Sequence, residues 1–548
     1  MNGFDRIERS PSAYEYPLLV KQLLASQAAR PSNREIVYRN QFRYGYTDLQ
    51  RRVRQLANVL TGLGAHGGQT VAIMDWDSLR YLEAYFAVPM LGCVLQTVNI
   101  RLSPEQMLYT INHARADVLL VHRDFLPVLE GFYDKLETAK TFILLDEQGA
   151  SAESRVPFAG EYEALLAQAS GDYAFPEFDE NARMTTFYTS GTTGLPKGVY
   201  YSHRQMVLHT LSIAATLGTA ARQGRISVDD VYMPITPMFH VHAWGMPYLA
   251  TLLGLKQVYA GRYSPELLLE LIANEGVTFS HCVPTILHML LTHPASKGVD
   301  LSRWKVLIGG SALPQGLARA ALDRGIDVFA GYGMSETGPL QTINHLRSEQ
   351  LDADLDTQVA LRTRAGTPAL MCQIGIMNDA GELQPQGGSG EIVFRSPWNT
   401  QGYFRNAEAS EVLWAHGWMH SGDIGSFTAD GVLQISDRVK DVIKTGGEWV
   451  SSLDIENLLS AHPAVGEVAV IGVRDPKWGE RPMALVVQRA DQRNQVTVDE
   501  LKAHLMQYAE RGIISKYGVP EQIVFVETLE KTSVGKLDKK VLRTKFGS

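Results

Sequence analysis

The feature that most constrains the fold is an alternation of short apolar runs with longer helical ones. A helical pattern begins at Thr47, which has the spacing of a capping box with Gln50, and its apolar residues recur until Gly64. An apolar strand pattern follows over residues 70–75, and a second helical run covers residues 78–91. Further apolar runs of strand length cover residues 118–122, 142–146, 185–189 and 306–310. Strands that alternate with helices are typical of α/β proteins with largely parallel sheets.

The pattern changes after Gly366. Residues 374–397 are typical of strands joined by turns that contain Gly and Asp, which indicates a more antiparallel, β-rich subdomain. Beyond it, two strands and a helix are predicted over residues 465–473, 482–488 and 501–512. We therefore predict a large domain over residues 1–437, with mostly parallel sheets and a β-rich subdomain, and a small mobile αβ C-terminal domain over residues 438–548.

Composition and charge argue against several classes of protein. No run approaches the roughly 18 apolar residues of a membrane helix, and the first residues lack the apolar core of a secretory signal. The formal net charge of −8 argues against a nucleic-acid binder. Cys93, Cys282 and Cys372 lie far apart and form no CxxC pair. Scattered thiols are typical of a reducing compartment, so we predict a cytoplasmic location.

The segment with the clearest chemistry is YTSGTTGLPKG, residues 188–198. Its glycines let backbone N–H groups approach an anion closely, its hydroxyl groups add hydrogen-bond donors, and Lys197 adds a positive charge. It is not a Walker loop, because Gly198 stands where that loop has Ser or Thr. The segment predicts a loop that holds a polyphosphate.

Six further segments follow in order along the chain: PMFHVHAWG (237–245), VLIGGSALP (306–314), AGYGMSETG (330–338), GWMHSGDIG (417–425), SDRVKDVIKTGGEWV (436–450) and EKTSVGKLDKK (530–540). Together with the glycine-rich loop they resemble the motifs of the adenylate-forming superfamily, which holds acyl-CoA synthetases, firefly-type luciferases and peptide-synthetase adenylation domains. The resemblance covers the chain from about residue 185 to its end, in the family's order and spacing. It implies an enzyme that forms an acyl-adenylate from a carboxylic acid and ATP with Mg²⁺, then passes the acyl group to coenzyme A.

The resemblance also implies nucleotide contacts. They are Thr189, Ser190, Gly191, Thr192, Thr193, Gly194, Lys197, Ala330, Gly331, Tyr332, Ser335, Asp423, Arg438 and Lys536. Tyr332 would adjoin the adenine ring, and Asp423 with Arg438 would bind the ribose hydroxyls. Glu336 with Thr189 would hold Mg²⁺, a hard cation that prefers oxygen ligands. Without the resemblance, Glu336 would be interpreted as an ordinary helix-start residue and Asp423 as a turn former.

Lys536 and His240 are the other predicted catalytic residues. The compact ammonium of Lys536 suits a bridge between a carboxylate and a phosphate oxygen, and the resemblance makes it the catalytic lysine of adenylation. Lys539 and Lys540, by contrast, are expected to be solvated. His240 and His242 stand two apart, as on one face of a strand, but no convincing further zinc ligands accompany them. The resemblance places His240 beside the reacting carboxylate.

The predicted acid comes from the surroundings of Trp244. Residues 237–250 contain no acidic side chain, so the ammonium of an amino acid would be unpaired in an apolar site. A luciferase-type oxygenase shares the adenylation step and stays open. Trp244, four residues after His240, resembles the tryptophan that gates the acyl tunnel of medium- and long-chain enzymes; the alternative is a plain core aromatic. The predicted acyl pocket comprises Trp244, Val283, Pro284, Gly309, Gly310 and Ser311.

We therefore predict a fatty acid–CoA ligase for medium- to long-chain acids. The alternatives are a CoA ligase for a short sulfur-containing or aryl acid such as methylmercaptopropionate, and a nucleotide-binding protein without catalysis. The predicted partners are the carboxylic acid, ATP and coenzyme A, with no nucleic acid; whether the chain forms a homodimer stays open.

One active site must run two reactions with different requirements, and this predicts motion. The first reaction needs Lys536 over the phosphates, whereas the second needs a path for a thiol to the same carbon. We therefore expect the C-terminal domain to rotate about its linker, as in relatives, with Lys440 as the hinge. The residues predicted at the hinge or the coenzyme A path are Lys440, Lys444, Gly446 and Gly447.

Overall fold

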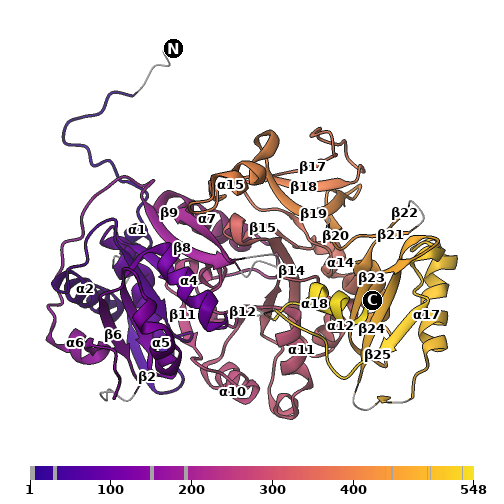
Figure 1. Cartoon of the computed structure of the whole chain (residues 1–548), viewed down its shortest axis with the longest axis horizontal. Coiled ribbons are helices and arrows are strands. Elements are labelled where there is room, and N and C mark those ends of the chain that lie inside the picture. The colour runs from indigo at the N-terminus through magenta and orange to yellow at the C-terminus, as the bar shows by residue number, and fades with distance from the viewer. Residues whose placement is uncertain are drawn as a thin grey trace.

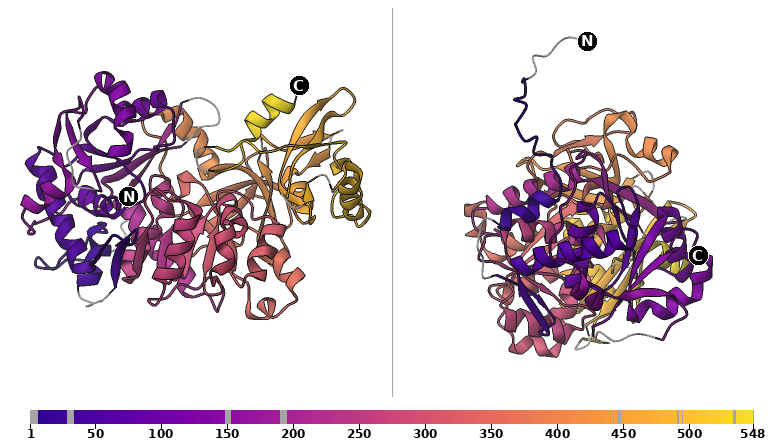
Figure 2. Two further views of the ribbon diagram at one scale, coloured as in Figure 1. Left: turned by 90° about the horizontal axis from the view of Figure 1, so that it is seen from below. Right: turned by 90° about the vertical axis from the view of Figure 1, so that its left-hand side faces the viewer.

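The computed structural model describes residues 7–28, 34–147, 153–189, 195–438, 440–445, 448–489, 492–493, 495–532 and 535–547. Within these residues the strands form four sheets, and the chain runs from one end of the molecule to the other (Figure 1). Figure 2 shows the N-terminal part and the C-terminal domain at opposite ends, with helices of the middle segment between them.

The first sheet lies in the N-terminal part and has the strand order β7-β6-β5-β3-β4-β8-β9. These strands are β3 (Thr70–Met74), β4 (Val94–Thr97), β5 (Ala116–His122), β6 (Thr141–Leu145), β7 (Phe158–Glu161), β8 (Arg183–Thr189) and β9 (Lys197–Ser202). All neighbours are parallel except β8 and β9. The helices that connect or cover them are α2 (Tyr46–Gly62), α3 (Leu79–Met90), α4 (Pro104–Ala114), α5 (Leu126–Phe132) and α6 (Tyr162–Gln168). Since helices cover a parallel sheet, its strands are apolar on both faces, as the fully buried β3 illustrates.

The second sheet occupies the centre and has the order β16-β15-β14-β13-β12-β10-β11-β1-β2. Its strands are β1 (Glu35–Tyr38), β2 (Phe42–Gly45), β10 (Val231–Pro234), β11 (Lys256–Tyr259), β12 (Phe279–Cys282), β13 (Lys305–Ile308), β14 (Asp327–Gly333), β15 (Leu340–Ile343) and β16 (Thr367–Pro368). The strands from β14 across to β1 are parallel, and the outer ones pair antiparallel. Helix α1 (Lys21–Ala28) precedes β1 in sequence. The other helices of this region are α7 (His203–Gly218), α8 (Val241–Trp244), α9 (Met246–Leu253), α10 (Pro265–Glu275), α11 (Pro284–Thr292), α12 (Gln315–Asp323), α13 (Ser348–Leu351) and α14 (Leu355–Arg362).

Two smaller sheets follow. The third is antiparallel, with the strands β17 (Gln373–Met377), β18 (Gly390–Arg395), β19 (Met419–Phe427) and β20 (Leu433–Arg438), and α15 (Ala407–Leu413) lies between β18 and β19 in sequence. The C-terminal domain has the strands β21 (Ile443–Thr445), β22 (Glu448–Val450), β23 (Val465–Asp475), β24 (Gly479–Gln488) and β25 (Gln522–Phe525). Its helices are α16 (Ser452–Ser460), α17 (Val498–Glu510) and α18 (Lys539–Phe546).

The predicted α/β class is confirmed, together with the antiparallel region and the αβ C-terminal unit. The predicted capping box at Thr47 is wrong: α2 begins at Tyr46, and its N-cap is Gly45, which makes no side-chain cap bond. Because β2 runs directly into the helix, Thr47 is already in the first turn and cannot cap it. The division at residue 437 stays a prediction. None of the described helices has the length and apolarity needed to cross a lipid bilayer.

Candidate active site

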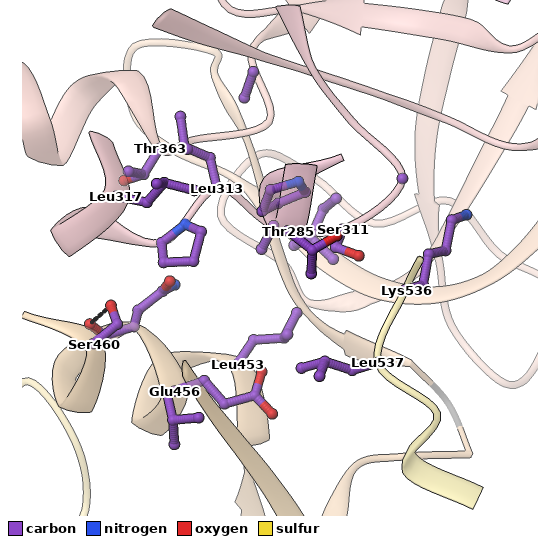
Figure 3. Close-up of a pocket in the computed structure, with 18 of the residues that line it drawn as sticks. Thr285, Ser311, Leu313, Leu317, Thr363, Leu453, Glu456, Ser460, Lys536 and Leu537 are labelled. Atoms are coloured by element: carbon purple, nitrogen blue, oxygen red, sulfur yellow. Dashed lines mark hydrogen bonds between the residues drawn. The ribbon is translucent and has the colours of Figure 1, made fainter. Parts of the chain in front are cut away.

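The predicted site residues converge where the parallel strands of the second sheet end. His240 follows β10, Pro284 follows β12, Gly310 follows β13, and Tyr332 lies near the end of β14. In open α/β sheets, ligands bind at this carboxyl edge because the loops and helix starts there surround a common crevice. These residues border a cavity of about 2010 Å³, which also touches the C-terminal domain (Figure 3).

Most of the predicted residues line this one cavity. They are Thr189, His240, Pro284, Gly310, Ser311, Ala330, Gly331, Tyr332, Ser335, Glu336, Asp423, Arg438, Lys440 and Lys536. Ser190–Gly194 and Gly446–Gly447 lie outside the described residues. Lys444 lies on β21 apart from the lining, where its backbone N–H donates to Glu480 at 3.0 Å.

Lys536 enters the cavity from the C-terminal domain. Its Cε lies over Gly310, so closely that a Cβ on this glycine would come within 2.9 Å of it. The segment that carries the lysine is fastened by Thr285, whose Oγ1 donates to the carbonyl oxygen of Gly535 at 3.1 Å. The missing side chain at residue 310 thus leaves the space that Lys536 occupies.

Neighbouring groups set the charge of Lys536. Burial and then Arg438 lower the pKa of Lys536 from 10.5 to about 8, while Asp423 and Glu336 favour its charged form. Burial, Lys536 and a nearby arginine lower the pKa of His240 to about 3, so its imidazole is neutral at physiological pH. A neutral imidazole beside an ammonium can hydrogen-bond a carboxylate while adding no charge of its own.

Glu336 is held by a tyrosine that the sequence motifs do not include. Tyr403 donates its hydroxyl to Glu336 Oε1 at 2.7 Å, and Lys197 Nζ lies 4.6 Å from the centre of the Tyr403 ring. Burial raises the pKa of the Glu336 carboxyl, and Tyr403 and Lys197 counteract that rise. Glu336 and Thr189 border the same cavity, and each has a side-chain oxygen that can be a metal ligand. They therefore fit the Mg²⁺ that the family implies. Nothing in the local sequence marks Tyr403, because its contact is 67 positions away.

The register of two strands places Asp423 opposite Arg438. They are direct partners on the antiparallel strands β19 and β20, and Arg438 Nε lies 3.6 Å from Asp423 Oδ1. The hydroxyl of Tyr332 donates to Asp423 Oδ2 at 2.7 Å. The carboxylate, the guanidinium and the aromatic ring therefore meet in the lining of the cavity, in the grouping that the resemblance implied for a nucleoside.

Trp244 lies in a turn of unusual backbone geometry. The φ angles of Val241, His242, Ala243 and Trp244 are +49°, +53°, +47° and +60°, so this turn is left-handed and His240 and His242 do not share a strand. Such a conformation costs about 1–2 kcal/mol for each residue other than glycine.

The turn directs the Trp244 ring onto Gly309, where a Cβ would come within 2.9 Å of Cη2. Trp244 is 4% exposed, and the centre of its ring lies 5.0 Å from the centre of the His281 ring. Trp244 is thus packed in the core, and its role as a gate stays a prediction. Val283, from the same predicted pocket, lies close to Gly310 and Gly535.

The prediction for Lys539 is wrong, because this lysine is not a solvated tail residue. Its Nζ lies 2.7 Å from Glu456 Oε1, and the two side chains are only 11% and 12% exposed. The sequence showed only a lysine-rich run, and α16, which supplies Glu456, is far from it along the chain. Lys540 is exposed, as expected.

Comparisons with known proteins identify the family of the chain. Residues 24–404 match the model of the AMP-binding enzyme family, and residues 454–536 match that of the AMP-binding enzyme C-terminal domain. The chain is 38% identical to a long-chain-fatty-acid–CoA ligase of Thermus thermophilus, over all of this chain and 96% of the relative. It is 36% identical to a medium-chain-fatty-acid–CoA ligase of Ectopseudomonas oleovorans, over 92% of this chain and 90% of the relative.

A third relative and a solved structure are also similar to the chain. A 3-methylmercaptopropionyl-CoA ligase of Ruegeria lacuscaerulensis is 36% identical, over 97% of each chain. Among solved structures, the anthranilate CoA ligase AuaEII in complex with anthranoyl-AMP superposes with a TM-score of 0.84 at 23% identity, over 96% of this chain and 98% of the other, which shows the fold. The chain therefore belongs to the family of AMP-binding enzymes.

Proposed function

We propose that the chain activates a medium- to long-chain fatty acid as its acyl-adenylate and transfers the acyl group to coenzyme A. The coarser activity, that of an AMP-forming acid–CoA ligase with ATP and coenzyme A as substrates and Mg²⁺ as cofactor, follows from the family and its relatives. The identity of the acid and the roles of individual residues are the proposed part, and the cytoplasmic location and a homodimer stay predictions.

The observation that carries the proposal is the meeting of Lys536 with His240 and Glu336 in one cavity. Adenylation joins two anions, a carboxylate and the α-phosphate of ATP, and the repulsion between them must be overcome. The ammonium of Lys536 would bridge their oxygens, and neutral His240 would orient the carboxylate. Mg²⁺, bound by Glu336 and Thr189, would neutralise charge on the phosphates.

The nucleoside would lie beside these groups, because Arg438 and Asp423 are close enough to Lys536 to change its pKa. Asp423 and Arg438 would bind the ribose hydroxyls, and Tyr332, held by its bond to Asp423, would adjoin the adenine. After adenylation, we propose that the C-terminal domain rotates at Lys440, which takes Lys536 out of the cavity and leaves a path for the thiol.

The buried position of Trp244 favours a second candidate for the acid. In this structure the ring fills the hollow over Gly309, so a long chain would have to displace it. A short acid, such as a sulfur-containing or aryl one, would not. The long-chain, medium-chain and 3-methylmercaptopropionyl relatives are similar to this chain at 38%, 36% and 36% identity, so identity alone does not separate the candidates.

A panel of acids tests both candidates. Acids from C3 to C16, methylmercaptopropionate and benzoate would be compared by kcat/KM for pyrophosphate release with the wild type and with Trp244→Ala. We expect the wild type to prefer C8–C16 acids, and Trp244→Ala to change the chain-length preference without changing the KM for ATP. A preference for the short acids would support the second candidate. Equal losses for every acid, with a lower melting temperature, would make Trp244 a core aromatic only.

A further inference from the structure

The close approach of α12 to α16 joins the C-terminal domain to the large domain. We propose that Gly316, near the start of α12, is a positioning residue for adenylation. Because it has no side chain, α16 can pack against α12 while Lys536 lies inside the cavity. The proposal rests on the proposed two-step function. In this role Gly316 acts through its contact with α16.

The fit at Gly316 is against backbone. A Cβ at this position would lie 3.1 Å from the carbonyl carbon of Ser460, closer still to its oxygen, and 3.8 Å from Cα of Ala461. These atoms belong to the end of α16, so no side-chain rotation can relieve the contact. Figure 3 shows Ser460 at the cavity, on the opposite side from Leu317 of α12.

A largely buried ion pair connects α16 to the segment that carries Lys536. Glu456, one helical turn earlier on α16, binds Lys539 at 2.7 Å, and Lys539 follows Lys536 by three residues. Lys539 Nζ also donates to Ser452 Oγ at 2.6 Å, at the first residue of the same helix. The seat of α16 on α12 therefore sets how far Lys536 reaches into the cavity.

The other end of α16 is tied across the proposed hinge. The backbone N–H and the hydroxyl of Ser452 donate to Asp437 Oδ2 at 2.7 and 2.6 Å, and Asp437 is 2% exposed. Asp437 precedes Lys440, whereas Ser452 follows it, so a rotation at Lys440 would separate the two. The contacts at both ends of α16 thus belong to the orientation in which Lys536 lies in the cavity.

Alanine at residue 316 should destabilise the docked orientation of α16 without unfolding the large domain. Gly316 lies in a helix with no left-handed φ, and alanine is a better helix former than glycine by up to about 1 kcal/mol. The large domain should therefore fold normally. The added methyl group meets an obstacle only when α16 is docked, where overpacking of this kind costs enough to reduce a population about tenfold or more.

The test compares Gly316→Ala with Gly131→Ala, a matched change in α5 where a Cβ would meet nothing within 4 Å. ATP–pyrophosphate exchange with the acid that the wild type prefers should fall about tenfold or more in Gly316→Ala and stay unchanged in Gly131→Ala. Thioester formation from supplied acyl-adenylate and coenzyme A should stay within about twofold of the wild type in both variants.

A readout independent of activity is hydrogen exchange at the Ser452 amide, which Asp437 protects in the docked state. We expect faster exchange there in Gly316→Ala, with exchange in α17 unchanged, which separates undocking from unfolding. Normal pyrophosphate exchange, equal losses in both half-reactions, or unchanged protection of Ser452 would each overturn the proposal. If the wild type activates no acid at all, the proposed function fails, while the Ser452 measurement still decides whether Gly316 controls docking.

Discussion

The pKa of Lys536 predicts an alkaline limit for adenylation. In the role proposed for Lys536, the ammonium must be charged to bridge the carboxylate and the α-phosphate. Burial together with Arg438 lowers its pKa from 10.5 to about 8. Because the charged form is the active one, adenylation should fall as the pH rises through this value. An exposed lysine would keep its charge until about pH 10.

The size of the effect follows from the fraction of Lys536 that is protonated. With a pKa of about 8, this fraction falls from about nine tenths at pH 7 to about one tenth at pH 9, so the rate should fall about tenfold. With a pKa of 10.5, the loss over the same range would be only a few per cent. Bound ATP adds negative charge and favours the ammonium, so the effect belongs to the free enzyme.

The assay is kcat/KM for ATP in pyrophosphate exchange between pH 6.5 and 10, since this parameter reports the ionisations of the free enzyme. Arg438→Met should move the alkaline limb, the pH range over which kcat/KM falls, to higher pH, because Arg438 is one cause of the low pKa. Since Arg438 is also a proposed ribose contact, the readout is the pH of this limb and not the absolute rate. Residual exchange in Lys536→Met should lack the limb. A limb that stays in Lys536→Met, or a wild-type profile flat up to pH 9.5, would refute this reasoning.

Three further predictions concern the metal, the hinge and acid stability. Glu336→Gln should raise the Mg²⁺ concentration for half-maximal exchange about tenfold at an unchanged melting temperature, since one charged ligand is lost; an unchanged titration would remove Glu336 from the metal site. Lys440→Pro fixes φ near −65° and removes an N–H, which should restrict rotation of the C-terminal domain. Pyrophosphate exchange should therefore persist, while thioester formation from acyl-adenylate is mostly lost. Lys440→Ala is the control, and equal losses in both assays would contradict the assignment of Lys440 as the hinge. Burial lowers the pKa of several core histidines to about 3, namely His203, His209, His242 and His281. The unfolded chain therefore takes up protons below pH 6.5 that the folded one does not, and the free energy of unfolding should fall by up to about 2 kcal/mol per histidine between pH 7.5 and 5; a denaturation midpoint that does not change with pH would contradict this.

Local patterns predicted elements where the local signal and the tertiary environment agree. The apolar runs of β3 and β5 are buried within a covered parallel sheet, so their composition alone indicated strands. The helix at residues 78–91 was predicted within one residue of α3, which begins after the N-cap Ser78. The capping box at Thr47 failed because the strand before it joins the helix without a loop.

The candidate site divides in the same way. The glycine-rich and acidic motifs are continuous in sequence, so the resemblance could point to Glu336, Asp423 and Lys536, and the structure brings all three to one cavity. Tyr403 was missed because it acts only through a distant carboxylate. Lys539 was misinterpreted because a lysine beside other lysines is solvated unless some remote element, here α16, supplies a partner.

By itself, the sequence determined the α/β class, the family and the choice of candidate site residues, because those depend on residue type and on short-range order. Only the tertiary structure decided the charge state of Lys536 and His240, since a pKa depends on burial and on neighbours that folding brings close. It also decided that Trp244 packs on Gly309 and that α16 seats on Gly316. Those contacts join segments far apart in the chain, and their fit depends on the shapes of two surfaces that exist only after each part has folded.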